Sequence, residues 1–209
     1  MNVLIACEAS GVARDAFTRK GHYALSCDSR PSDTVGPHYV GDVLELLCEE
    51  WDLMVAHPPC TYICSSGIHW TNNGYRPLAL TEEALSFFLA LLEAPIPHIG
   101  IENPVGIVST TMRPPDQYIQ PYNFGEDASK KTGLWLKNLP RLQPTKGIKP
   151  RWVKGLPRWA NQTDKGDNAI GPNKSRSAMR SQTYPGIAAA MADQWGAFVR
   201  PVTDILKEN

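Results

Sequence analysis

Short apolar runs alternate with segments of mixed apolar and polar residues through the first half of the chain. Runs of this length and composition are typical of buried strands. They occupy residues 2–7, 23–28, 51–57 and 97–103. The segments between them predict helices over residues 12–19, 42–47 and 81–94. Strands separated by helices indicate a parallel, doubly wound sheet, so the predicted fold class is α/β, Rossmann-like, with helices on both faces.

The two longest helical patterns carry end signals. Thr81 is expected to cap the helix over residues 81–94, and Glu82 and Glu83 favour its positive N-terminal end. A final helix is expected over residues 185–199, with Pro185 at its start.

Residues 113–180 are dense in Pro, Gly and charge, which predicts short strands and loops. We therefore divide the chain into a catalytic and cofactor-binding core (1–112), a small basic lobe (113–180) and a helix returning to the core (181–209).

Composition places the chain among soluble globular proteins, with 42% apolar and 20% charged residues over 209 positions. No apolar run approaches the roughly 18 residues that span a bilayer, and the first residues resemble a strand rather than a signal peptide. An odd number of cysteines, five, argues against a disulfide framework. We expect a cytoplasmic protein, a monomer or dimer, in which Cys7, Cys27 and Cys48 are buried and structural.

The net charge of zero hides a strong asymmetry along the chain. Residues 1–127 hold 6 Lys/Arg against 16 Asp/Glu, whereas residues 128–180 hold 13 against 2. Trp135, Trp152 and Trp159 lie among these cations. Basic residues interleaved with aromatic ones are typical of nucleic-acid binding. A solvated surface whose tryptophans cover the core is the alternative.

Polar residues of functional type follow four successive predicted strands. Glu8 and Ser10 follow the first, Asp28 the second, Cys60 the third and Glu102 ends the fourth. Ligands of such sheets bind at the carboxyl ends of the strands, and Asp28 lies where an acid can accept hydrogen bonds from a ribose. The loop "CEASGV" has one glycine, Gly11, so it predicts no pyrophosphate cradle.

Two motifs in register carry a family resemblance. "HPPCTYICSSG" followed by "IENP" resembles the Pro-Cys and Glu-Asn motifs of the DNA cytosine-5 methyltransferases, especially a compact phage and prophage branch. "ACEASGVARDAF" is similar to the family's first cofactor loop, "SCD" to its ribose-binding acid and "GDV" to its third motif. "SQTYPGIAAAMADQW" resembles the helix that completes the cofactor pocket. The first loop departs from the family in lacking an aromatic residue and several glycines, and no clear Arg-x-Arg motif is present.

The resemblance implies S-adenosylmethionine as cofactor, DNA as partner, and methyl transfer to carbon 5 of cytosine. Cys60 would be the nucleophile that adds to carbon 6, Glu102 the partner of ring nitrogen N3, and Asn103 the residue that fixes the loop. The implied cofactor-binding residues are Glu8, Ser10, Gly11, Asp28, Asp42 and Pro58. The implied nucleic-acid-binding residues are Lys130, Lys131, Arg176 and Arg180.

Other readings stay open at this point. Cys60 would be an inert loop cysteine, or His57, Cys60, Cys64 and His69 would bind zinc, although the spacing and the prolines disfavour zinc and we expect no metal. "HPPCTY" also invites comparison with amino-group methyltransferases, which need no nucleophile. Glu102 would be a plain helix-capping or loop acid. Two further alternatives for the whole chain are a related one-carbon transferase acting on a nucleotide or RNA, and an inactive methyltransferase-like nucleic-acid binder.

Overall fold

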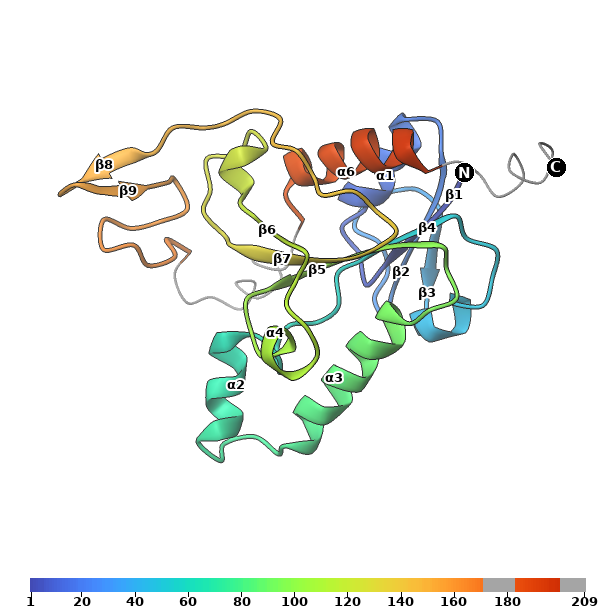
Figure 1. The fold of residues 1–209 in the computed structure, drawn as a ribbon, viewed down its shortest axis with the longest axis horizontal. Coiled ribbons are helices and arrows are strands. Elements are labelled where there is room, and N and C mark those ends of the chain that lie inside the picture. The colour runs from blue at the N-terminus through green and yellow to red at the C-terminus, as the bar shows by residue number, and fades with distance from the viewer. Residues whose placement is uncertain (171–182, 200–209) are drawn as a thin grey trace.

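A seven-stranded sheet forms the centre of the molecule, which we describe from a computed structural model covering residues 1–170 and 183–199 (Figure 1). The strand order is β3-β2-β1-β4-β5-β7-β6. The strands of this sheet are β1 (Asn2–Ala6), β2 (Tyr23–Asp28), β3 (His38–Val40), β4 (Leu53–Ala56), β5 (His98–Pro104), β6 (Gln117–Ile119) and β7 (Thr132–Lys137). The helices are α1 (Val12–Arg19), η1 (Val43–Leu46), α2 (Ser65–Asn72), α3 (Ala79–Leu92), α4 (Val108–Thr111), η2 (Pro121–Asn123) and α6 (Pro185–Phe198).

The first five strands are parallel, and β7 runs antiparallel between β5 and β6. The chain moves outward from β1 through β2 to β3, then returns to place β4 on the other side of β1. The predicted doubly wound α/β fold is confirmed. The crevice between the carboxyl ends of β1 and β4 is the point where such sheets bind ligands.

The alternation of side chains along β1 separates the core into two layers, as expected for a strand buried on both faces. Val3 and Ile5 pack with one cluster of buried residues, and Leu4 and Ala6 with the other. Residues Val3 to Ala6 are therefore apolar and buried on both faces, and the polar Asn2 at the start of the strand is exposed.

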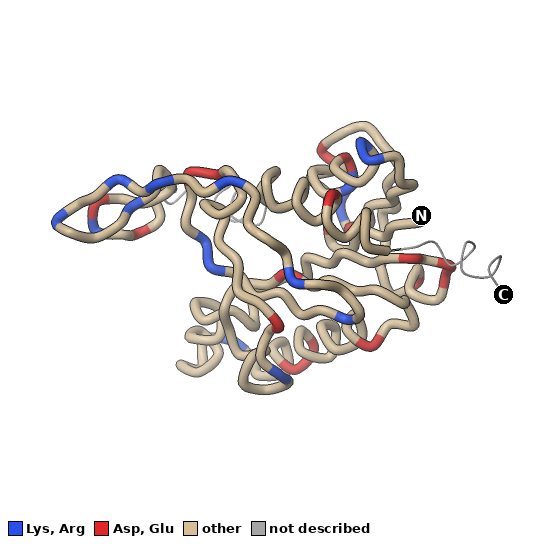
Figure 2. Tube along the Cα trace, turned by 45° about the horizontal axis from the view of Figure 1, so that its top comes forward, with Lys and Arg blue, Asp and Glu red and all other residues tan. Residues whose placement is uncertain are grey.

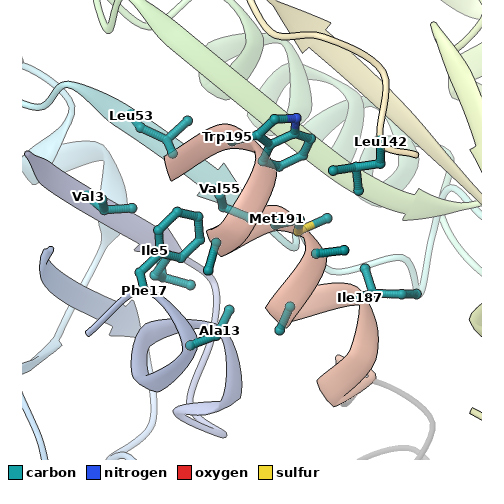
Figure 3. Packing of buried hydrophobic residues seen from close by; sticks show 14 of the residues in the cluster. Val3, Ile5, Ala13, Phe17, Leu53, Val55, Leu142, Ile187, Met191 and Trp195 are labelled. Atoms are coloured by element: carbon teal, nitrogen blue, oxygen red, sulfur yellow. The ribbon is translucent and has the colours of Figure 1, made fainter. Parts of the chain in front are cut away.

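Helices α1 and α6 cover the first face (Figure 3). Phe17 of α1 and Met191 and Trp195 of α6 are fully buried against β1 and β4. Gly100 of β5 admits the Trp195 ring, because a Cβ there would lie 2.7 Å from it. The Trp195 Nε1 group donates to the Pro140 carbonyl at 3.0 Å, so the indole is buried without an unpaired N–H.

Helix α3 covers the opposite face (Figure 1), together with η1 and α4. Phe88 of α3 meets Trp135 of β7 edge to face, with ring centroids 5.1 Å apart. Trp135 is thus a core residue and offers no surface for stacking a base. For this tryptophan, the alternative that the aromatic residues of the basic segment cover the core is correct.

Some local predictions are wrong. Thr81 does not cap α3: the helix begins two residues earlier after Leu78, and Thr81 is buried within it. Its hydroxyl instead lies 3.2 Å from that of Thr71 in α2. Cys48 is exposed and Cys7 is only partly buried, whereas both were predicted to be buried, and Cys27 is buried as expected.

The first part of the segment predicted as a small basic lobe belongs to the main sheet, and a later part forms a separate hairpin. Strands β6 and β7 belong to the seven-stranded sheet. Beyond β7, a hairpin of β8 (Arg151–Val153) and β9 (Leu156–Arg158) projects from the body (Figures 1 and 2). Lys154 and Gly155 at its tip have positive φ values of 50° and 78°, which a tight two-residue turn requires.

Candidate active site

The register of the parallel strands aligns four strand ends at one level of the sheet. Ala6 pairs with both Cys27 and Ala56, and Ala56 pairs with Ile101. The next residues along these strands are Cys7, Asp28, His57 and Glu102. Two of them, Asp28 and Glu102, are predicted site residues, and they therefore lie at the same edge of the sheet.

A cavity of about 1710 Å³ lies along this edge. Three predicted acids, Glu8, Asp28 and Asp42, line it beyond β1, β2 and β3, and Cys60 and Glu102 line it beyond β4 and β5. Ser10, Pro58, Lys130 and Lys131 also line the wall. The strand order places β3, β2 and β1 on one side and β4 and β5 on the other. The three acids therefore lie toward one end of the cavity, and Cys60 and Glu102 lie toward the other end.

The Pro-Cys loop begins where β4 loses its pairing. The His57 N–H donates to the Ala6 carbonyl at 2.9 Å, and the two prolines that follow have no N–H with which to extend the ladder. Asn103 is buried, and its Nδ2 donates to the Pro58 carbonyl at 2.8 Å. Asn103 does not line the cavity, so its place in the structure is that of a support for the loop.

Cys60 and Cys64 are neighbouring cysteines on this loop whose thiols interact. The Cys64 N–H donates to the Cys60 carbonyl at 2.9 Å, closing one turn directly before α2. The interaction with Cys60, the Ser66 hydroxyl at 3.3 Å and the backbone N–H of Gly67 lower the pKa of Cys64 against the opposing effect of burial. The pKa of Cys60 is raised, first by its interaction with Cys64 and then by burial. Of the two thiols, Cys64 therefore loses its proton more readily, and it precedes the first turn of α2.

Glu102 is a nearly buried carboxylate, with 13% of its side chain exposed. Burial alone would raise its pKa, but the hydrogen bond from His57 and the positive charge of Lys130 lower the pKa to about 2. Its Oε2 lies 3.2 Å from His57 Nδ1. Glu102 is thus ionised at neutral pH and available as a hydrogen-bond acceptor.

Glu8 is held at the start of α1. Its Oε1 accepts hydrogen bonds from the Ser10 hydroxyl at 2.6 Å and from the Ala13 N–H at 3.0 Å. Its Oε2 is buried and has no hydrogen-bond partner in the described part of the chain. An unpaired buried carboxylate oxygen on a cavity wall is suited to a cationic or hydrogen-bond-donating ligand group.

Gly11 has a positive φ of 75°, and a Cβ there would lie 2.0 Å from the Thr34 hydroxyl. It does not line the cavity, so the turn and the close approach of the next loop explain the glycine. The fully buried Arg14 holds that loop, donating to the Thr34 hydroxyl at 2.6 Å and to the Val35 carbonyl at 3.2 Å. These bonds fix the segment that follows Asp28.

Asp28 and Asp42 occupy neighbouring strand ends. Asp28 Oδ1 accepts from the Arg30 N–H at 3.0 Å, which orients the carboxylate beside the cavity. Asp42 caps η1 by accepting from the Leu44 N–H at 3.0 Å. Both carboxylates keep acceptor capacity for a ligand.

The predicted nucleic-acid-binding cations are only partly described. The Lys131 ammonium lies 4.2 Å from the centre of the Tyr118 ring, and that of Lys130 lies 5.9 Å from the centre of the Tyr184 ring. Arg176 and Arg180 lie outside the described residues.

Sequence reasoning named His57 and Cys64 only as zinc ligands, and it did not single out Arg14. Within residues 1–170 and 183–199, no three His, Cys, Asp or Glu side chains are grouped as metal ligands are. His69, the fourth member of the zinc pattern, is exposed on α2 and hydrogen-bonded to Asn73. The contact of His57 with Glu102 had no signal in sequence spacing, since 45 residues separate them. No helix in the described ranges combines the length and apolar character needed to cross a bilayer.

Comparisons with known proteins give matches in structure alone. No protein-family model and no curated protein matches the chain. Among 51 solved chains that match, one is described provisionally as a DNA modification methyltransferase encoded within a prophage of E. coli. It shares 14% sequence identity with a TM-score of 0.47, over 74% of this chain and 53% of that chain. This chain therefore spans about half the length of that protein.

Proposed function

We propose that this protein transfers a methyl group from S-adenosylmethionine to carbon 5 of cytosine in DNA, through a covalent adduct at Cys60. The observation that carries the proposal is the cavity at the carboxyl edge of the sheet. Acids line it beyond β1 to β3, and a thiol and an ionised carboxylate line it beyond β4 and β5. Cofactor and target base would lie side by side along this edge.

The end of the cavity that is lined by Glu8, Asp28 and Asp42 fits the cofactor. Asp28 would accept hydrogen bonds from the ribose hydroxyls, as an acid at this strand end does in related sheets. Glu8 would bind the cofactor's ammonium group through Oε2, which has no partner among the described residues. Ser10, Asp42 and the loop that follows Gly11 would complete the wall. Bound there, S-adenosylmethionine would supply an electrophilic methyl group.

The other end fits the base. Cys60 would add to carbon 6 as its proton passes to the Cys64 thiolate, and ring nitrogen N3 would take a proton from water. The ionised Glu102 would accept a hydrogen bond from the N3–H group, which stabilises the charge that develops on attack. After carbon 5 takes the methyl group and S-adenosylhomocysteine is released, water would remove the carbon 5 proton and Cys60 would leave as a thiolate. N3 would then return its proton to water, and Cys64 would return the proton to Cys60.

DNA would be bound by the basic segment around the cavity and by the projecting hairpin. Trp152 in β8 is 69% exposed. Lys149, Arg151, Lys154 and Arg158 lie on or beside the hairpin by their positions in the chain, and Figure 2 shows several Lys and Arg positions along the projecting segment. Cations attract the phosphates, and an exposed indole offers a face on which a base can stack. A base within a duplex must leave the stack to reach Cys60, so the hairpin would hold the DNA during this step.

Transfer of tritium from labelled S-adenosylmethionine tests the proposal. Duplex DNA, single-stranded DNA, RNA and dCTP would be compared as acceptors, and the methylated nucleoside identified by mass spectrometry. We expect 5-methyl-2′-deoxycytidine from DNA, loss of activity in Cys60→Ser, and retained activity in Cys48→Ser, an exposed cysteine outside the cavity. Labelled N4-methylcytosine, or equal activity in Cys60→Ser, would contradict it. Label in RNA or dCTP alone would reassign the substrate.

A further inference from the structure

His57 joins three segments that surround the proposed base site. It follows β4, its Nδ1 lies 3.2 Å from Glu102 Oε2, and the same atom lies 3.4 Å from the hydroxyl of Thr183, before α6. The imidazole is nearly buried, with 7% of its side chain exposed, and His57 lines the cavity together with Glu102 and Thr183. Its contacts therefore connect the floor of the site to β5 and to the C-terminal segment.

The chemistry of the pair fixes the position of one proton. An ionised carboxylate only accepts hydrogen bonds, so His57 Nδ1 carries the hydrogen that faces Glu102. The other ring nitrogen, Nε2, is buried and has no hydrogen-bond partner among the described residues. Contact with Glu102 through Nδ1 is therefore the principal polar interaction of a ring that would otherwise be costly to bury.

The contact with His57 helps keep the carboxylate of Glu102 ionised. Burial favours the neutral form of Glu102, and His57 and Lys130 are the leading groups that counter this effect by lowering its pKa. The ionisable groups that face it from other elements are Cys60 on the Pro-Cys loop and Tyr184 before α6, and the Glu102 charge helps raise the pKa of each. Without His57, Lys130 would be left as the leading group that keeps Glu102 ionised.

We propose that His57 is a positioning residue that holds Glu102 as an ionised, oriented hydrogen-bond acceptor for the N–H groups on the reacting edge of the base. This role of His57 rests on the proposed function, which supplies cytosine as the substrate. In this role Glu102 accepts hydrogen bonds from the base, whereas a general acid would donate its own proton to N3. A fixed carboxylate accepts from the amino group and protonated N3 of cytosine. It repels the carbonyl oxygen that uracil and thymine present in place of that amino group. His57 would thus contribute to selection of cytosine as well as to rate.

Three substitutions separate a hydrogen-bonding role from a packing role. His57→Leu fills the space without a donor, His57→Ala removes the ring, and His57→Asn places an amide N–H near the position of Nδ1. His69→Asn changes an exposed histidine outside the cavity and is the matched control. For each variant, the methylation rate would be measured from about pH 5 to 9, where the wild-type Glu102 stays ionised.

The expected result is a rate about tenfold lower in His57→Leu and His57→Ala, because Glu102 loses the donor that orients its carboxylate. With burial less opposed, the pKa of Glu102 would also rise from about 2 by about one unit or more, but the carboxylate would stay ionised above about pH 5, so the loss of rate would be similar across the range. His57→Asn would restore most of the rate. An equal loss in the Leu, Ala and Asn variants would overturn the proposal and leave His57 a packing residue.

A second readout does not depend on the reaction. The carboxyl carbon of Glu102 would be followed by nuclear magnetic resonance in ¹³C-glutamate-labelled protein without substrate, with Glu102→Gln identifying the signal. His57→Leu is expected to raise the pH at which this signal titrates, and an unchanged titration would overturn the role of His57. If the wild type titrates as expected but transfers no methyl group, the proposed function fails while the pairing of His57 with Glu102 stands.

Discussion

The side chain of Asn103 ties the loop after β4 to β5, donating from Nδ2 to the Pro58 carbonyl across 2.8 Å. Cys60 is two residues beyond Pro58 on that loop, and Glu102 directly precedes Asn103 on β5. One buried hydrogen bond thus fixes the relative position of the two side chains that we assign to the reaction. Positioning of this kind is what converts two nearby groups into a catalytic pair.

Asn103→Ala is expected to cost about 1–3 kcal/mol of unfolding free energy, because the Pro58 carbonyl loses its buried donor. The same change should lower the methylation rate more than it lowers the affinity for S-adenosylmethionine. The lost bond holds the Pro-Cys loop and does not contact the acids that line the other end of the cavity. Urea unfolding and rate measurements check both parts. Asn73→Ala removes a similar but exposed bond of 2.7 Å to the His69 carbonyl and should leave both quantities near the wild-type values.

Asp28→Ala is expected to weaken S-adenosylmethionine binding about 10- to 100-fold, the usual cost of losing a hydrogen bond to a charged group. Titration calorimetry measures the dissociation constant directly. Asp193→Ala, which removes an acid paired with Lys20 on the surface of α6, is the control and should bind normally. Equal affinities for Asp28→Ala and the wild type would place the cofactor elsewhere in the cavity.

The charge on Cys64 predicts an unusual alkylation profile. A lowered pKa means that the thiolate persists as the pH falls below the range in which ordinary thiols react. At about pH 6, iodoacetamide should therefore modify Cys64 faster than it modifies glutathione, whose thiol is protonated there. Peptide mass mapping locates the label. Cys60→Ala removes the largest cause of the lowered pKa and should slow the reaction of Cys64, and an unaffected rate would contradict the interaction of the two thiols.

Trp152→Ala is expected to weaken DNA binding about 5- to 100-fold, the range measured for loss of one base-stacking aromatic. Loss of a stacking contact should leave the slope of affinity against salt concentration unchanged, because phosphate contacts set that slope. Fluorescence anisotropy at several salt concentrations provides both values. Tyr23→Ala, an exposed aromatic at the opposite end of the strands, should bind like the wild type. Equal affinity of Trp152→Ala would exclude the hairpin from the interface.

Much of the fold is readable from the chain because its strands are buried on both faces. Continuous apolar runs such as "NVLIA" and "LMVA" predict such strands well, and β1, β2 and α1 have nearly the expected bounds. The sequence does not predict strand β3, because its three residues are not fully buried and carry no apolar pattern. It also predicts the wrong start for α3, because Thr81 packs against α2, a tertiary contact that local capping rules do not contain.

The candidate site divides in a similar way. Glu8, Asp28, Cys60 and Glu102 could be proposed from sequence because each follows or ends a predicted strand, and parallel strands share one carboxyl edge. The partners that set their protonation could not. His57 meets Glu102 only through the register of β4 and β5, and the interaction of the Cys60 and Cys64 thiols depends on the turn that precedes α2.

Covalent trapping tests the central claim most directly. DNA in which 5-fluorocytosine replaces the target cytosine has no carbon 5 proton to lose, so an adduct formed at Cys60 would persist after methylation. The account predicts a protein–DNA band that survives denaturation, requires S-adenosylmethionine, maps to the peptide containing Cys60 and is absent in Cys60→Ala. DNA that is bound and methylated without any such band would contradict the Cys60 adduct. DNA that is bound with neither methylation nor an adduct would leave a binding protein that keeps the fold of an enzyme.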